Sequence, residues 1–486
     1  MNPLISFVFV SLIACGNVYA ETTLEDDLGG FEITEEPILD DLDGFDEEEL
    51  TSELDELSGF ENDDTSDEMP LKLVTNKENT FSLSGALTFK TAYGYKNHTV
   101  DNVEYKGFNQ AQTSLYLQLD STLSDTWKVR ISGDVYYDAL YDIQPNTNYN
   151  KDVTDAYKTQ VRLDDTYLQG RLTNALDVKI GRQKVVWGKS DSLRVTDVIN
   201  PIDNRLPGMT DIEDLRLSVA MIKLDYYVGM WNFSGMVIPE NRIFLEAPVR
   251  GEFFPVDAIF TGAPNPFIEL KNPSTSFDTM QYALAANGIF SGWDLSFYTA
   301  HVLDQKWYIN PSTNLREVTI INMLGSALNI ATGSWLLKSE IAYLNGIRYN
   351  STVDAKERVD IVVGFDYMGI KDTVLSLEIV NRHIFDYETQ MAQPGVKADF
   401  VDQDEMQTAL RYSRSFSNDS INANALVSMF GQSFEYGGFA RVWVSYAIQD
   451  ALNATVGFVD YRDGDKPFVK AISDNDRVFF DITYSF

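Results

Sequence analysis

Two reactive side chains are nearly missing from this sequence. Its 486 residues include one cysteine, Cys15, and three histidines, His98, His301 and His383. A single thiol excludes an intramolecular disulfide and a multi-cysteine metal site. Three histidines leave little material for a histidine metal centre or for acid–base catalysis. We therefore expect no metal, no cofactor and no catalytic residues.

Long apolar runs and net positive charge are absent as well. No stretch of about 18 consecutive apolar residues occurs, so we expect no transmembrane helix. The formal charge is −35, and residues 21–68 contain 22 acidic side chains with no Lys or Arg. Because nucleic-acid phosphates would be repelled, a nucleic-acid partner is excluded. Aromatic residues, in contrast, make up 13% of the chain, which suits a membrane interface or a wet lumen.

Residues 1–20 predict a secretory signal peptide. An apolar stretch covers Leu4–Ala14, and Val18-Tyr19-Ala20 precedes Glu21 as a cleavage site, although no Lys or Arg stands before the apolar stretch. The alternative is a lipoprotein signal, because Leu12-Ile13-Ala14-Cys15 resembles the sequence at which a cysteine is lipidated. We favour cleavage after Ala20.

Residues 21–70 form an acidic segment with too few apolar side chains and too much like charge to fold alone. The pattern acidic-acidic-Leu-x-Gly-Phe-acidic occurs in it three times, at 26–32, 40–46 and 55–61. Each repeat offers a Leu/Phe pair to an apolar groove, and repetition on one tether raises avidity. The expected docking residues are Leu28, Phe31, Leu42, Phe45, Leu57 and Phe60. Alternatives are an acidic spacer and a calcium chelator, although the ligand spacing of a calcium loop is absent.

Beyond Pro70, apolar and polar residues alternate as in β-strands. In 127–137 the odd positions are mainly apolar, and Lys128, Arg130 and Asp134 lie between them. In a soluble sandwich the apolar face would be inside, whereas in a membrane barrel it faces lipid and the polar face lines the lumen. Alternation alone leaves both possibilities open.

The last nine residues, 478–486, alternate in the same way and end in an aromatic residue. An edge strand of a soluble sandwich is one interpretation. The terminal aromatic also resembles the closing-strand signal of bacterial outer-membrane barrels. We therefore predict that the barrel-assembly machinery recognises the apolar face of this strand. The expected recognition residues on that face are Phe480, Ile482, Tyr484 and Phe486, and Val478 shares the face.

Connection lengths favour the membrane barrel. Very short turns are expected near 123–126, 172–174, 229–230, 291–292, 332–334, 369–372, 416–418 and 449–450. Long links are expected near 96–108, 140–158, 188–214, 240–276, 305–313, 346–354, 385–403 and 462–473. Short periplasmic turns that alternate with long external loops are typical of outer-membrane barrels.

Four tryptophans support this interpretation independently. Each follows a short turn, where a periplasmic aromatic girdle belongs. They are Trp127, Trp231, Trp293 and Trp335. We predict an all-β fold, an antiparallel transmembrane outer-membrane β-barrel of about 18 strands (roughly 14 to 18) over residues 71–486. Both termini, including the disordered acidic segment 21–70, are expected in the periplasm.

One stretch carries a family resemblance. Residues 181–191 read G-R-Q-K-V-V-W-G-K-S-D, and residues 193–201 read L-R-V-T-D-V-I-N-P. This resembles the signature of a family of Gram-negative outer-membrane proteins catalogued only as a domain of unknown function, number thirteen-oh-two. The resemblance is specific over 181–201, and the strand pattern is compatible with it across roughly 80–486. It implies a porin-like barrel, in some cases encoded near inner-membrane transporters of the resistance–nodulation–division type.

The same stretch predicts a strand that leaves the membrane. Ile180 is expected on the lipid face, and Arg182 and Lys184 fall in the same phase. Either Gly181 marks a bulge that flips the phase, or these cations reach the phosphates of the outer leaflet, whose lipid and lipopolysaccharide surround the barrel.

Two loops are expected to narrow the lumen. The first, in the link 188–214, has dense mixed charge. These charges either pin a folded-in loop by ion pairs or form a constriction that selects cargo by charge. The second, 240–276, is too apolar to stand in water, so it either plugs the barrel mouth or lines an apolar path. The candidate path or constriction residues are Arg182, Trp187, Lys189, Asp191, Arg194, Asp197, Arg205, Phe253, Phe254 and Phe260.

These features favour transport. We predict a conduit in the cell outer membrane for an amphipathic or hydrophobic small molecule, with the acidic segment docking a periplasmic or inner-membrane transport protein. One alternative is an outer-membrane enzyme such as a lipase, which would need a poised Ser and His, although no nucleophile elbow occurs. Another is a structural or adhesin barrel, which would leave the acidic repeats unexplained.

Overall fold

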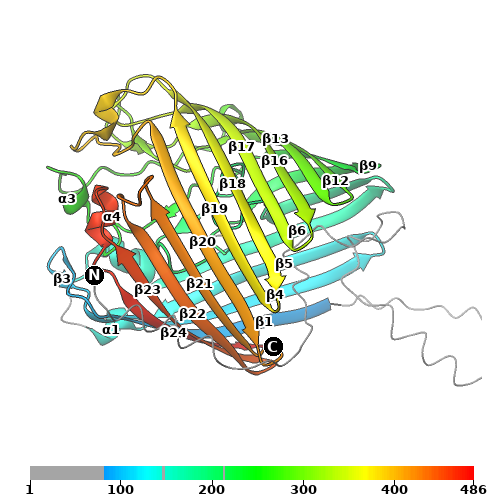
Figure 1. Ribbon diagram of the computed structural model, residues 1–486, viewed down its shortest axis with the longest axis horizontal. Helices are drawn as coiled ribbons and strands as arrows, with labels where there is room; N and C mark the ends of the chain where they lie inside the picture. Colours follow the sequence, from blue (N-terminus) through cyan, green and yellow to red (C-terminus); the bar gives the residue numbers. More distant parts are fainter. Residues whose placement is uncertain (1–80, 145–147, 212–213) are drawn as a thin grey trace, which may run out of the picture. The chain divides into compact units, whose positions relative to one another are not determined.

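Eighteen long strands form the body of the chain in a computed structural model, which describes residues 81–144, 148–211 and 214–486 (Figure 1). The expected signal peptide and the acidic repeats lie outside these residues. The long strands are β1 (Phe81–Gly94), β4 (Gly107–Ser124), β5 (Trp127–Asp138), β6 (Thr159–Thr173), β7 (Leu176–Gln183), β9 (Val219–Val228), β10 (Trp231–Ile238), β12 (Gln281–Phe290), β13 (Trp293–Leu303), β16 (Ile320–Thr332), β17 (Trp335–Ile347), β18 (Lys356–Ile370), β19 (Thr373–Ile384), β20 (Asp404–Phe416), β21 (Ile421–Phe430), β22 (Gly438–Gln449), β23 (Leu452–Arg462) and β24 (Arg477–Ser485).

The sheet closes on itself. Consecutive long strands pair in antiparallel fashion, and the last strand, β24, pairs with the first, β1, where Leu87 lies opposite Tyr484. No edge is therefore left unpaired among the long strands, which is the condition for a β-structure to cross a bilayer. The predicted fold class and the strand count of 18 are confirmed.

The apolar face of the strands lies on the outside of the barrel. In β5, Ile131, Val135 and Tyr137 are 42–44% exposed, whereas Ser132 and Asp138 are nearly buried at 2–3%. In β24, Val478, Phe480 and Tyr484 are exposed, while Arg477 and Phe479 face inward and are buried. A soluble sandwich would show the reverse, so the exterior is that of a membrane-embedded barrel. Among the described residues, no helix combines the length and apolarity needed to span a bilayer.

The two ends of the barrel differ. All eight predicted short turns are found at one end, and the four predicted girdle tryptophans are the first residues of β5, β10, β13 and β17. The carboxyl end of the chain lies at this end too, because Ser485 donates its N–H to the carbonyl of Ala451 in a short turn. We call it the short-turn end and the other the long-loop end. A link of seven residues between β21 and β22, 431–437, was missed by the sequence prediction.

The long links carry the remaining elements, and four helices lie at the long-loop end (Figure 1). These helices are α1 (Leu140–Ile143), α2 (Lys151–Tyr157), α3 (Val256–Ile259) and α4 (Pro467–Ile472). Three small sheets are made by the pairs β2 (Thr99–Val100) with β3 (Val103–Glu104), β8 (Asp203–Asn204) with β11 (Leu245–Glu246), and β14 (Tyr308–Ile309) with β15 (Arg316–Glu317). The parallel β8–β11 pair joins two long links that both turn into the lumen.

The bulge considered at Gly181 does not exist. The registers of β7 with β6 and with β9 run through Gly181 without a shift. Arg182 forms an ion pair with Glu240 and lies close to the carbonyl of Leu163. Lys184, one residue beyond the end of β7, lines an internal cavity instead of reaching the outer leaflet.

Candidate functional site

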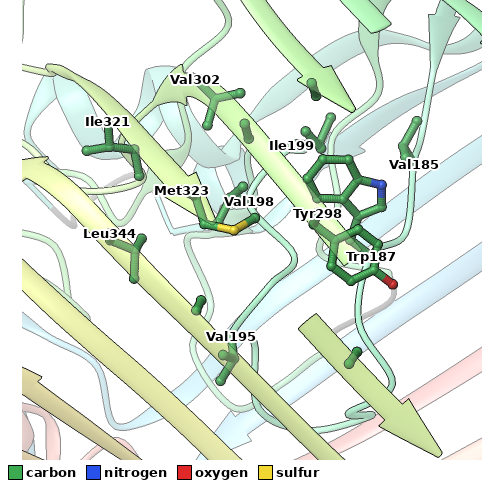
Figure 2. Close-up of a cluster of buried hydrophobic side chains, with 14 of the residues drawn as sticks. Val185, Trp187, Val195, Val198, Ile199, Tyr298, Val302, Ile321, Met323 and Leu344 are labelled. Atoms are coloured by element: carbon green, nitrogen blue, oxygen red, sulfur yellow. The ribbon is translucent and has the colours of Figure 1, made fainter. Parts of the chain in front are cut away.

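A segment of 16 residues, 184–199, folds into the lumen; we call it the strap. Its apolar side chains pack on the inward face of the strands between β9 and β20, where small or apolar residues such as Ala283, Ala300 and Ala342 are buried. Figure 2 shows the Trp187 ring against Tyr298, with the ring centroids 4.7 Å apart. The strap residues of this cluster are Val185, Trp187, Leu193, Val195, Val198 and Ile199. The inward face of β13, β16 and β17 is therefore apolar toward the long-loop end, unlike the simple alternation predicted.

The buried carboxylate of Glu340, on β17, holds the middle of the strap. One of its oxygens accepts the backbone N–H groups of Lys189 and Ser190 at 2.6 and 2.7 Å. The other accepts the N–H and the hydroxyl of Thr196 at 3.1 and 2.7 Å. Glu340 is 2% exposed, so these hydrogen bonds replace the water that an ionised carboxylate would otherwise require.

Glu378, on β19, holds the next residues in the same way. Its oxygens accept the N–H groups of Asp191, Ser192 and Leu193 at 2.8, 3.0 and 3.1 Å. They also accept the hydroxyl of Ser190 at 2.6 Å. Two carboxylates of the barrel wall thus satisfy backbone donors that a folded-in loop would leave unpaired.

The predicted constriction residues of the strap are also tied to the wall or to one another. Lys338 of β17 forms ion pairs with Asp191 and, at 2.6 Å, with Asp366. Asp197 binds the guanidinium of Arg194 at 3.0 Å, and Lys189 lies 3.5 Å from Asp294. The structure brings Trp187, Lys189, Asp191, Arg194 and Asp197 together in this network, which pins the strap. Charge selection by these residues stays a prediction.

Arg205 lies apart from the strap, on the opposite side of the lumen. It donates to Asp203 at 2.6 Å, to the carbonyl of Ala156 at 2.6 Å and to Gln160 at 3.0 Å. Burial by itself would lower the pKa of Arg205, but its hydrogen bonds and ion pair with Asp203 raise it. Arg205 therefore remains charged and faces a polar cavity.

A second folded-in segment, 248–268, is aromatic; we call it the plug. Phe253 is fully buried, and Phe254, Phe260 and Phe267 form a group of ring contacts with centroids 5.5–6.3 Å apart. The plug packs against inward-facing residues of the closing strands. These wall residues are Ala92, Trp443, Val459, Tyr461 and Phe479. The predicted inward folding of this loop is thus seen.

A buried ion pair anchors the plug to β24. Glu252 binds Arg477 at 2.8 Å, and both side chains are less than 10% exposed. The same guanidinium lies 4.7 Å from the centre of the Phe253 ring. Asn475 donates to the carbonyl of Glu252 at 2.8 Å. The anchor therefore combines charge, hydrogen bonds and a cation–π contact in one place.

The plug borders an apolar cavity of about 670 Å³, which we call the outer cavity. Its walls come from the plug, from β20–β22 and from long-loop segments. The apolar lining includes Phe244, Phe253, Phe254, Phe260, Trp307, Phe400, Leu426, Phe430, Phe439 and Phe468. Nine charged residues line it as well, among them Asp211 and Arg411. A concave pocket lined by apolar and aromatic side chains together with polar groups is the usual form of a small-molecule site.

A second cavity, of about 500 Å³, lies along β1 and β4–β6; we call it the polar cavity. Its lining includes Lys90, Gln112, Asp134, Arg162 and Arg205. Thr210 and Leu215 line both cavities, so the two cavities meet at these residues.

Sequence reasoning found the folded-in segments but missed their wall partners. Glu340, Glu378, Arg411 and Arg441 are charged residues on inward-facing strand positions. In a water-filled lumen such residues need no partner, so alternation gives no signal that they are fixed. Their burial depends on which loop reaches them, which no local pattern encodes.

Comparison with solved structures finds outer-membrane proteins. The chain is similar to OccAB1 of Acinetobacter baumannii, with a TM-score of 0.50, 11% identity and coverage of 84% of this chain and 97% of that chain. For OccK9 (OpdG) of Pseudomonas aeruginosa the values are 0.49, 12%, 84% and 98%. For the outer membrane protein opdK of P. aeruginosa they are 0.48, 11%, 83% and 99%. At 11% identity, the likeness to OccAB1 supports a porin-like fold and nothing further.

Comparison with curated protein sequences gives no match. A protein family, in contrast, matches residues 71–486, which include every described strand. The family is DUF1302, described as a protein of unknown function. Since this match covers most of the sequence, the chain belongs to the DUF1302 family.

Proposed function

We propose that this protein is an outer-membrane channel that admits amphipathic small molecules through the outer cavity. The observation that carries the proposal is an apolar cavity of about 670 Å³ inside a closed, lipid-facing barrel. A water-filled pore for ions needs no such surface, because apolar walls do not replace the hydration of an ion. An aromatic or aliphatic body, in contrast, gains free energy when it leaves water for this lining.

A pair of substitutions tests this use of the cavity. Ala409 faces inward on β20 and lines the outer cavity, so Ala409→Phe should fill part of it. Ala425, on the neighbouring strand, lies in the outward phase next to the exposed Tyr412, so Ala425→Phe is the matched control. Proteoliposome swelling would report the entry of phenyl glucoside, a neutral amphipathic probe, and of sucrose, a polar solute of comparable size.

We expect the protein to admit phenyl glucoside faster than sucrose, and Ala409→Phe to remove this preference. Ala425→Phe should keep it. Equal entry of the two solutes into wild-type proteoliposomes would contradict the proposal.

We further propose that the acidic segment 21–70 docks a periplasmic or inner-membrane transport partner. The three Leu/Phe repeats support this, because a spacer needs acidic charge but no regularly placed apolar pairs. Replacing Leu28, Phe31, Leu42, Phe45, Leu57 and Phe60 by Ala should abolish capture of inner-membrane or periplasmic proteins while the barrel still assembles. Neutralising the Asp and Glu residues is the comparison. Capture that survives the six alanines but not neutralisation would leave an electrostatic tether.

A further inference from the structure

Two arginines lie side by side next to the outer cavity, and one of them, Arg411, lines it. Arg411 of β20 and Arg441 of β22 both face inward, and Leu426 of β21 stands opposite each of them in the strand registers. Arg411 and Leu426 line the cavity directly, and Phe439 adds an aromatic wall. Two guanidinium groups are thus placed next to an apolar surface.

One carboxylate serves both arginines. Asp211 binds Arg441 at 2.5 Å and lies 3.6 Å from Arg411. It reaches them from the chain next to Thr210, where the two cavities meet, and this chain is fixed nearby because Tyr461 donates its hydroxyl to the carbonyl of Pro207 at 2.6 Å. Asp211 itself lines the outer cavity.

Arg441 has hydrogen-bond donors without a partner. It is 5% exposed, yet its Nε and Nη1 atoms have no hydrogen-bond partner. Its guanidinium carbon lies 3.8 Å from the centre of the Trp443 ring, which supports the charge without using those donors. Buried donors are almost always satisfied, so two guanidinium nitrogens without a partner point to an anion beyond Asp211.

Elsewhere on the cavity surface, Glu405 binds Lys466 at 2.7 Å and Asp191 binds Lys338, so these carboxylates already have cationic partners.

We propose that Arg411 and Arg441 form the subsite for the carboxylate of an amphipathic ligand whose apolar body lies in the outer cavity. Asp211 is then an internal competitor for the same guanidinium donors. A bidentate guanidinium–carboxylate contact away from water is both strong and directional, which the amide of an uncharged analogue cannot reproduce. This inference rests on the proposed function of the outer cavity and names the class of molecule that the cavity receives.

Calorimetry on the full chain in lipid nanodiscs tests the proposal with two probes of one shape. Naphthalene-2-carboxylate carries the charge, and naphthalene-2-carboxamide does not. We expect the carboxylate to bind at least about tenfold more tightly to the wild-type protein, as a charge-assisted hydrogen bond implies. Equal affinities would overturn the proposal, and this comparison needs no variant to fold.

Three variants then assign the effect to the subsite. Asp211→Asn removes the competitor and should raise carboxylate affinity several-fold while leaving the carboxamide unchanged. Arg411→Gln together with Arg441→Gln should erase the preference for the carboxylate. Arg462→Gln, which neutralises a half-exposed arginine at the long-loop end of β23, is the matched control and should keep it.

Loss of carboxylate affinity in Asp211→Asn would also overturn the proposal, because it would mean that Asp211 only supports the arginines. Failure here is distinguishable from failure of the proposed function. If the carboxylate has no advantage but phenyl glucoside still enters faster than sucrose, the outer cavity serves neutral amphipathic molecules instead.

Discussion

The strap and the plug are both long links folded into one lumen, but they are held in opposite ways. The strap gives its backbone donors to two buried wall carboxylates, Glu340 and Glu378, and its apolar side chains pack against the barrel wall. The plug is held to the wall mainly by ring contacts and by the Glu252–Arg477 ion pair, and it borders a large cavity. Directional hydrogen bonds fix one geometry, whereas aromatic contacts tolerate several. The difference indicates a fixed scaffold on one wall and an adaptable surface on the other.

The largest expected effect comes from Glu378→Ala. Without this carboxylate, three strap N–H groups and the hydroxyl of Ser190 lose their acceptor inside the barrel. We expect the free energy of unfolding to fall by about 3–5 kcal/mol. Single-channel conductance should rise, because the strap leaves the wall. Denaturant titration and planar-bilayer recording measure these two quantities.

Glu357→Ala is the control for that variant, since Glu357 is an exposed carboxylate on β18 that accepts a hydrogen bond from Asn345. It should change both quantities little. A Glu378→Ala protein with wild-type stability and conductance would mean that the strap does not depend on the wall carboxylates.

Phe253→Ala should have the next largest effect, on the plug. The ring is fully buried and packs near Arg477 and Tyr461, so its loss creates a cavity that costs about 3 kcal/mol or more locally. Because the plug adapts, we expect the assembled barrel to persist with a higher conductance and more frequent current fluctuations. Phe277→Ala removes a ring that is 88% exposed and should do neither.

Substitutions at two glycines compare the strap with the plug, because both glycines have a positive φ and an added side chain strains the backbone similarly at each. Gly188 in the strap and Gly262 in the plug have φ of +90° and +76°. An added Cβ at Gly188 would lie 2.6 Å from a Glu340 oxygen, whereas at Gly262 it would meet one side chain at 3.9 Å. Gly188→Ala should therefore destabilise the barrel by about 2 kcal/mol more than Gly262→Ala. Equal losses of stability in thermal unfolding would show that the strap accommodates an added methyl group as readily as the plug does.

The smallest expected effect is a pH response at the anchor of the plug. Burial lowers the pKa of His98, whose ring lies near the Glu252 carbonyl, with Asp474 and Arg477 close by. Because the buried ring is more stable when neutral, the folded plug is favoured at a pH where His98 is neutral. That stability is lost as pH falls below the free histidine pKa of about 6.5. We expect current fluctuations to become roughly two- to threefold more frequent at pH 5 than at pH 8.

His98→Gln should remove this pH response, because glutamine does not titrate. His301→Gln is the matched control, since His301 contacts Asn322 on the strands and lies away from the plug. A response that persists in His98→Gln would assign it to another group.

The strands could be predicted from the sequence because their pattern is local. Each turn of two to four residues and each outward apolar face is encoded in a few neighbouring positions, so the eight short turns and the girdle tryptophans were found correctly. The bulge at Gly181 was a wrong prediction, because it was inferred from the local pattern alone. That pattern placed Arg182 on the lipid face unless a bulge reversed the alternation, but the ion pair with Glu240 accommodates its charge without a bulge. Only the structure shows that partner.

The site was predicted in part. Mixed charge in the first loop and apolar residues in the second indicated that both fold inward, and Phe253, Phe254 and Phe260 do line the outer cavity. Arg411 and Arg441 could not be found, because their meeting with Asp211 joins positions about 200 or more residues apart. Such contacts follow from closing the barrel and placing a loop, and neither is a local property of the sequence.

Cysteine accessibility tests the contrast between scaffold and adaptable surface most directly. Cys15 is the only cysteine in the chain, so after Cys15→Ser a single reporter can be placed at either site. Leu426→Cys would lie on the outer cavity, and Ala342→Cys would lie under the strap, where Ala342 is fully buried. We predict that N-(1-naphthyl)maleimide labels Leu426→Cys within minutes and lowers its conductance, whereas Ala342→Cys stays unlabelled. Equal labelling of the two cysteines would contradict the account.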